Sequence, residues 1–106
     1  MMACQGQAPI VNSMPVGVLT LDIQIPWSHS LKEKRAVLRR VRDRLKSRFN
    51  VAVAELDARD VWQQATLGIA AISSSRPLLE EVLQRVLEES ERVLGEDVHD
   101  YNIEIF

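Results

Sequence analysis

The sequence predicts an α+β domain of order β-α-β-β-α-β, in which a four-stranded antiparallel sheet carries two helices on one face. Four segments alternate between apolar and polar residues, with the two-residue period of half-buried strands. Two segments between them carry apolar residues with a helical period. With right-handed crossovers, this order gives a split β-α-β sheet. The length of 106 residues fits one domain.

The first strand and the first helix are predicted from alternation and from a capping motif. In residues 16–25, alternate positions are apolar and share one face: Leu19, Leu21, Ile23 and Ile25. Ser30 and Glu33 form a capping-box pattern, in which each side chain accepts a hydrogen bond from the backbone N–H of the other residue. A helix is therefore expected over about 31–48. Its core-facing apolar stripe contains one charged residue, Lys34, which we expect to extend past the sheet edge or to pair with an acid.

The remaining elements follow from alternation and helix-end signals. Residues 51–57 and 65–73 are predicted strands, and the short polar link between them favours a hairpin. The second helix is expected to begin near Pro77 and to end at Gly95. Residues 98–106 alternate again and form the last strand. Residues 1–13 show no period and are expected to be a disordered extension, so the single domain covers 14–106.

Cysteine use and hydropathy indicate a cytoplasmic protein. Cys4 is the single cysteine, so no intrachain disulfide can form. No apolar run reaches the roughly 18 residues that cross a bilayer, and no membrane contact is expected. Residues 1–14 lack the charged and apolar regions of a signal peptide.

The charge distribution is the strongest functional signal. Residues 32–48 contain nine of the 13 basic residues and two acidic ones, a net charge of +7, whereas the rest of the chain carries −9. The candidates for contact with the phosphates of a nucleic acid are Lys32, Lys34, Arg35, Arg39, Arg42 and Lys46. Two alternatives remain open: the face is merely solvated, or Arg39 and Arg42 pair with acids of the second helix. An acidic protein partner is a further possibility.

The second candidate region is the polar connection that contains Asp60, Trp62 and Gln63, which could form a recognition tip. The alternative is that Trp62 covers the sheet edge and that Asp57 caps a turn. Asp57 and Asp60 lack a third ligand at useful spacing, and the two histidines lack partners at metal-binding spacing. No metal, cofactor or catalytic residue is therefore expected.

The outer face of the predicted sheet disfavours the usual sheet-surface mode of RNA recognition. That mode stacks bases on exposed aromatic residues of the central strands. The positions of this face contain no aromatic residue: Val18, Thr20, Asp22, Gln24, Gly68, Ala70 and Ile72. The same face could instead be covered by another subunit, in a homodimer or a higher oligomer.

Four further segments stand out, in the order Val16-Gly-Val-Leu, Ser30-Leu-Lys-Glu-Lys-Arg35, Arg48-Phe-Asn-Val-Ala-Val-Ala-Glu55 and Asp60-Val-Trp-Gln-Gln-Ala-Thr-Leu-Gly68. In this order, they resemble the YlxP-like family of small bacterial proteins of unknown function. The resemblance covers nearly all of 14–106. It implies a ferredoxin-like fold and a bacterial cytosolic protein whose genes often lie near those for translation initiation and ribosome maturation. It brings no activity, cofactor or catalytic residue.

These observations lead to one main hypothesis and two alternatives. The main hypothesis is a non-enzymatic RNA- or ribosome-associated protein that contacts phosphates through its basic first helix. The first alternative is a homo-oligomeric interaction module that uses the open sheet face and the 60–63 connection. The second alternative is an enzyme of unknown reaction, which no set of residues specifically supports.

Overall fold

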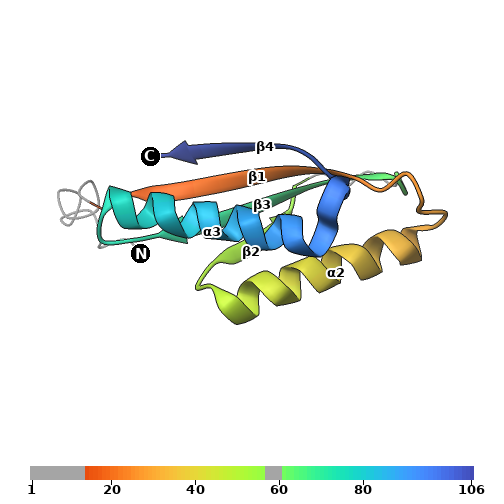
Figure 1. Ribbon diagram of the computed structural model, residues 1–106, viewed down its shortest axis with the longest axis horizontal. Helices are drawn as coiled ribbons and strands as arrows, with labels where there is room; N and C mark the ends of the chain where they lie inside the picture. Colours follow the sequence, from red (N-terminus) through yellow and green to blue (C-terminus); the bar gives the residue numbers. More distant parts are fainter. Residues whose placement is uncertain (1–13, 57–60) are drawn as a thin grey trace, which may run out of the picture.

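The computed structural model describes residues 14–56 and 61–106. Their elements follow in the order β1 (Val16–Gln24), α2 (Leu31–Arg48), β2 (Ala52–Glu55), β3 (Gln64–Ile72), α3 (Arg76–Leu94), a 3₁₀ turn (Gly95–Asp97) and β4 (Val98–Ile105). The strands form one antiparallel sheet in the order β2-β3-β1-β4. Both helices lie on the same face of this sheet (Figure 1). The predicted fold class is therefore confirmed.

The element bounds agree closely with the sequence, except at β2. The first helix spans 31–48 as predicted. The second strand spans Ala52–Glu55, so it begins one residue later than predicted, and the Leu56 N–H still donates to the Thr66 carbonyl oxygen of β3 at 2.8 Å. Residue 57 of the predicted strand lies outside the described residues. β2 is an edge strand, so only one side of it has a partner that can extend the ladder. The predicted extension over 1–13 lies outside the described residues.

Serine side chains begin both helices. The Ser30 hydroxyl accepts from the Glu33 N–H at 3.1 Å, and the Ser75 hydroxyl accepts from the Leu78 N–H at 3.3 Å. The Glu33 carboxylate accepts from the His29 N–H at 2.6 Å, so it reaches one residue further back than the capping box predicts. Each serine side chain thus satisfies one backbone N–H group in the first turn of its helix.

The core lies between the sheet and the helices, and α3 packs against its centre. The side chains of Leu19, Leu21 and Ile69 on the central strands are fully buried, as are Leu79 and Leu83 on α3. Each such side chain contributes about 1.5–3 kcal/mol of hydrophobic stabilisation. Gly17 permits the close approach of α3, because a Cβ at this position would lie 2.6 Å from Leu83 Cδ1.

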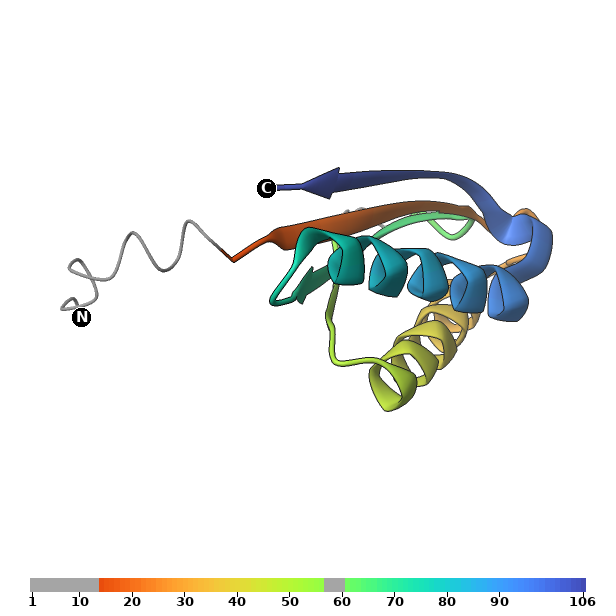
Figure 2. The same ribbon diagram turned by 60° about the vertical axis from the view of Figure 1, so that its left-hand side comes forward.

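The other helix on this face, α2, runs at an angle to α3. Its C-terminal end stands further from the sheet than α3 does (Figure 2). The side of α2 that faces β2 is therefore open along part of its length. Neither helix in the described ranges is long and apolar enough to cross a membrane.

Candidate functional site

Seven of the eight exposed basic residues of α2 form two flanks beside its buried stripe, and the eighth, Arg40, belongs to neither flank. The stripe consists of Lys34, Val37, Leu38, Val41 and Leu45. We define the β2-side flank as the five basic residues at helical spacing on the side toward β2: Lys32, Arg35, Arg39, Arg42 and Lys46. We define the α3-side flank as Arg44 and Arg48, which approach α3.

A groove of about 360 Å³ lies between α2 and β2. Three arginines of the β2-side flank form one wall of this α2–β2 groove, and an apolar floor and one acidic residue complete it. The lining residues are Arg35, Leu38, Arg39 and Arg42 from α2, Val53, Ala54 and Glu55 from β2, and Leu67 from β3. The sequence does not reveal this groove, because its width depends on the angle at which α2 crosses the sheet.

The cations of the β2-side flank are exposed and almost free of acidic partners. Within residues 14–56 and 61–106, Arg42 is the one member with an ion pair, to Asp43 at 3.5 Å. Both side chains of that pair are about half exposed or more, so solvent and salt weaken it. The other four members have no acidic partner within 4.0 Å in the same ranges. The charge of this flank can therefore act on a ligand.

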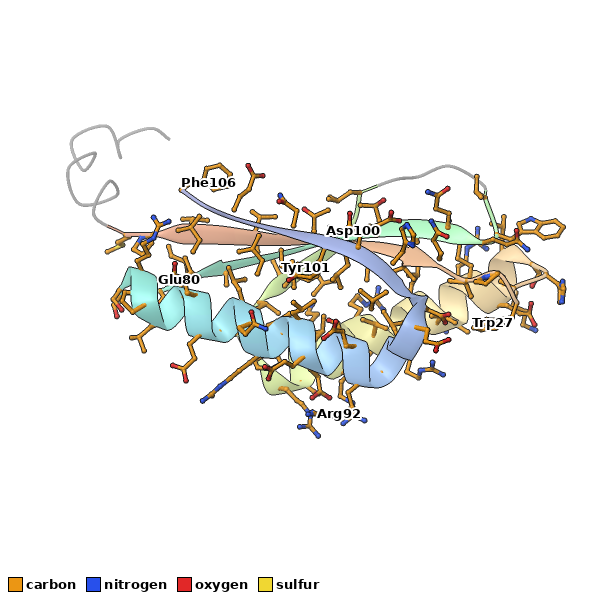
Figure 3. All side chains as sticks on the ribbon, turned by 45° about the horizontal axis from the view of Figure 1, so that its top comes forward. Trp27, Glu80, Arg92, Asp100, Tyr101 and Phe106 are labelled. Atoms are coloured by element: carbon orange, nitrogen blue, oxygen red, sulfur yellow. The ribbon has the colours of Figure 1, made fainter. Side chains whose placement is uncertain are left out.

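Both cations of the α3-side flank lie close to one buried carboxylate of α3. Glu89 on α3 is 3% exposed, and its Oε2 lies 3.6 Å from the Nε atoms of both Arg44 and Arg48. Arg92 adds a third cation at 2.5 Å from Oε1, and its side chain projects from the side of α3 away from the sheet (Figure 3). The predicted pairing between the helices therefore exists, but it engages Arg44 and Arg48 in place of Arg39 and Arg42.

Two further acids of α3, Glu80 and Glu81, form their ion pairs within their own helix. Glu80 pairs with Arg76 and Glu81 pairs with Arg85, both within one turn of α3. These are exposed i,i+4 pairs, which stabilise a helix by a few tenths of a kcal/mol. They leave the charge of the β2-side flank unchanged.

Lys34 does not belong to the exposed phosphate-contact set. The residue is 3% exposed, and its ammonium donates to the Val61 carbonyl oxygen at 2.8 Å and lies 3.6 Å from Glu55 Oε2. We therefore correct the prediction that placed it among the nucleic-acid contacts. Its position in the middle of the apolar stripe made burial foreseeable, whereas its partners come from β2 and from the residues that precede β3.

The connection before β3 is only partly described, since Asp57 and Asp60 lie outside the described residues. Trp62 is 49% exposed and remains available as a contact. The Gln63 amide donates to the carbonyl oxygens of Pro26 and Ser28, at 3.1 and 3.3 Å. Gln63 thus holds the loop between β1 and α2 in place, a structural role that the sequence did not indicate.

A second tryptophan lies at the same end of the molecule. Trp27 is about half exposed and donates from Nε1 to Asp97 Oδ2 at 3.1 Å, so it joins the β1–α2 loop to the turn before β4 (Figure 3). Trp27 thus ties two loops together while about half of its surface stays exposed.

The open sheet face carries a pair of facing carboxylates. Asp22 on β1 lies opposite Asp100 on β4, and both line a hollow of about 150 Å³. The Asp22 Oδ1 atom is buried and accepts no hydrogen bond among the described residues. Like charges in cross-strand pairs are unfavourable, and this pair could not be foreseen because alternation does not reveal register. No group of three or more metal-binding side chains is found in the described ranges.

Comparison with solved structures concerns the fold alone. The designed protein Foldit4 superposes with a TM-score of 0.55 at 14% sequence identity, over 88% of this chain and 96% of that chain. The designed protein Ferredog-Diesel gives 0.53 at 17% identity, over 84% and 83% of the two chains. The observed architecture is thus a ferredoxin-like fold, which hosts many unrelated functions.

Comparison of sequences identifies the family. The Bacillus subtilis (strain 168) protein named "Uncharacterized protein YlxP" is 55% identical over 72 residues, which cover 68% of this chain and 78% of that protein. The family model described as "Protein of unknown function (DUF503)" matches residues 16–103. The resemblance expected from the four sequence segments is thereby confirmed, and the chain belongs to this YlxP-like family.

Proposed function

We propose that the protein binds RNA, free or within the ribosome, through phosphate contacts of the β2-side flank and without catalysing a reaction. The observation that carries this proposal is the row of exposed cations on that flank, beyond the reach of the acids of α3. The row extends from Lys32 to Lys46, about 21 Å along the helix axis. A row of that kind suits a phosphate backbone better than a single anion.

RNA affinity should fall with salt concentration at a slope set by the number of phosphate contacts. Each phosphate contact on a single strand releases counterions and contributes about −0.7 to the slope of log K against log salt. Five contacts would give a slope of about −3.5. A much shallower slope would mean that the flank does not track the backbone.

The test is binding of the purified protein to ribosomal subunits and to structured RNA across a salt series. Arg39→Glu/Arg42→Glu is expected to reduce affinity by more than tenfold, because it reverses two charges at the centre of the flank. The matched control is Arg76→Glu/Arg85→Glu, which reverses two exposed charges on α3. Absence of binding at about 50 mM salt, or an equal loss in both double variants, would contradict the proposal.

Self-association through the open sheet face is a second candidate, supported by exposed apolar side chains. Val16 and Ile72 face each other across β1 and β3 and are 38% and 64% exposed. They line a hollow of about 410 Å³ together with residues of β2 and the segment before it. A patch of this kind is a common interaction surface.

This second candidate is tested by light scattering over a concentration series. Ile72→Glu is expected to shift the mass toward that of the single chain, whereas Leu78→Glu, at an exposed position on α3, is the control. A mass equal to one chain at every concentration of the unaltered protein would rule out self-association.

A further inference from the structure

The α2–β2 groove has features that phosphate contact does not require. Phosphates need only cations, which an open helix face supplies. This groove also has a floor built from Leu38, Val53 and Leu67, and it places Glu55 opposite the arginines. An apolar floor and a carboxylate indicate a ligand that also has an apolar surface and hydrogen-bond donors.

The Glu55 carboxylate is held in position by a buried cation. Its Oε2 lies 3.6 Å from the ammonium of Lys34, which is itself fixed by its hydrogen bond to the Val61 carbonyl oxygen. The Glu55 side chain remains 40% exposed, so it can accept hydrogen bonds from a ligand in the groove. An ionised carboxylate only accepts hydrogen bonds, and it repels phosphate. The matching ligand group must therefore be a donor.

Nucleobases combine a flat apolar face with donors on one edge. The Watson–Crick edge of guanine offers two adjacent donors, N1–H and the N2 amino group, which match the two oxygens of one carboxylate. The corresponding edges of uracil and adenine place acceptors beside their single donors. The groove volume of about 360 Å³ is at the lower end of the range for small-ligand pockets and is sufficient for one base.

We propose that the α2–β2 groove receives one unpaired guanine base, whose N1–H and N2 amino group donate to Glu55 while Arg35, Arg39 and Arg42 contact the neighbouring phosphates. This inference rests on the RNA binding proposed above and names the part of the RNA that is read. Guanidinium planes can also stack on the base, in the absence of an aromatic side chain. Because pairing hides the Watson–Crick edge, the ligand is a loop, a bulge or a single strand.

The experiment measures fluorescence anisotropy of labelled ribonucleotides of equal length. The probes are oligouridine, oligouridine with one central guanosine, the same strand with inosine in place of guanosine, and a fully paired duplex. The guanosine probe is expected to bind about tenfold more tightly than oligouridine, within the range for a bidentate contact. Inosine lacks only the N2 amino group and is expected to lose most of that preference.

The protein variants are Glu55→Gln and, as the matched control, Glu104→Gln on the exposed edge strand β4. Glu55→Gln is expected to abolish the preference for guanosine and to retain binding to oligouridine, whereas Glu104→Gln retains both. The inosine probe keeps the test decisive even if Glu55→Gln fails to fold, because it uses the unaltered protein.

The outcomes separate the two proposals. Equal binding of guanosine, inosine and oligouridine probes, or of single strand and duplex, would overturn this inference and leave phosphate binding by α2 intact. Absence of binding to every probe at about 50 mM salt would overturn both proposals.

Discussion

The two flanks of α2 carry the same kind of residue but differ in what their neighbours supply. On the α3-side flank, Arg44 and Arg48 share a buried carboxylate, Glu89. On the β2-side flank, Arg35 and Arg39 line a groove and have no acidic partner within 4.0 Å among the described residues. The difference teaches that a basic helix is not a uniform surface. The acids of the adjacent element determine which side serves the fold and which side is left for a ligand.

Reversing the charges of the α3-side flank is expected to cause the largest loss of stability. Arg44→Glu/Arg48→Glu would place carboxylates beside the buried Glu89 and lower the free energy of unfolding by about 2–3 kcal/mol. The same reversal on the other flank, Arg39→Glu/Arg42→Glu, should change it by less than about 1 kcal/mol. Urea denaturation measures both quantities. Equal destabilisation by the two double variants would remove the distinction between the flanks.

A smaller loss of stability is expected when the buried Lys34 is replaced, and almost none when the exposed Lys32 of the same helix turn is replaced. Lys34→Met keeps the side-chain volume but leaves the Val61 carbonyl and Glu55 without their cation, so we expect a loss of about 2 kcal/mol. Lys32→Met, at an exposed position, should stay within about 0.5 kcal/mol. Thermal and urea unfolding of the two variants check this, and similar midpoints would mean that the Lys34 contacts contribute no net stability.

The smallest change in stability is expected at Asp43, which among the described residues is the one acid paired with the β2-side flank. Asp43→Asn removes an exposed ion pair to Arg42 and should change the free energy of unfolding by less than about 0.5 kcal/mol. It should raise RNA affinity about twofold, because it removes a negative charge beside the flank. Glu96→Gln, in the 3₁₀ turn, is the control. An RNA affinity that falls in Asp43→Asn would show that the pair orients Arg42 for binding.

The fold could be predicted from the sequence because the signals for its elements are local. Strand alternation, the serine at position 30 and the glycine at position 95 each act within a few residues, and the helix bounds 31–48 follow from them. The helical period also places Lys34 in the buried stripe. These local rules determine which side of an element faces the core.

The site could be predicted less well because it depends on how the helices and strands are placed relative to one another. The helical period gives the angular position of Arg39 and Arg44 around α2 but not the position of Glu89 on the neighbouring helix. Register decides that Asp22 faces Asp100, and neither strand reveals it alone. The width of the groove depends on the angle at which α2 crosses the sheet, and that angle follows from packing of the whole core.

The contact between Lys34 and Glu55 has a consequence for the thermodynamics of ligand capture. It joins the two walls of the α2–β2 groove through a buried ammonium, so the spacing of the walls at that end is set when the protein folds. A ligand that enters the groove does not have to immobilise the walls first. Less conformational entropy is lost on association, and more of the contact energy remains as affinity.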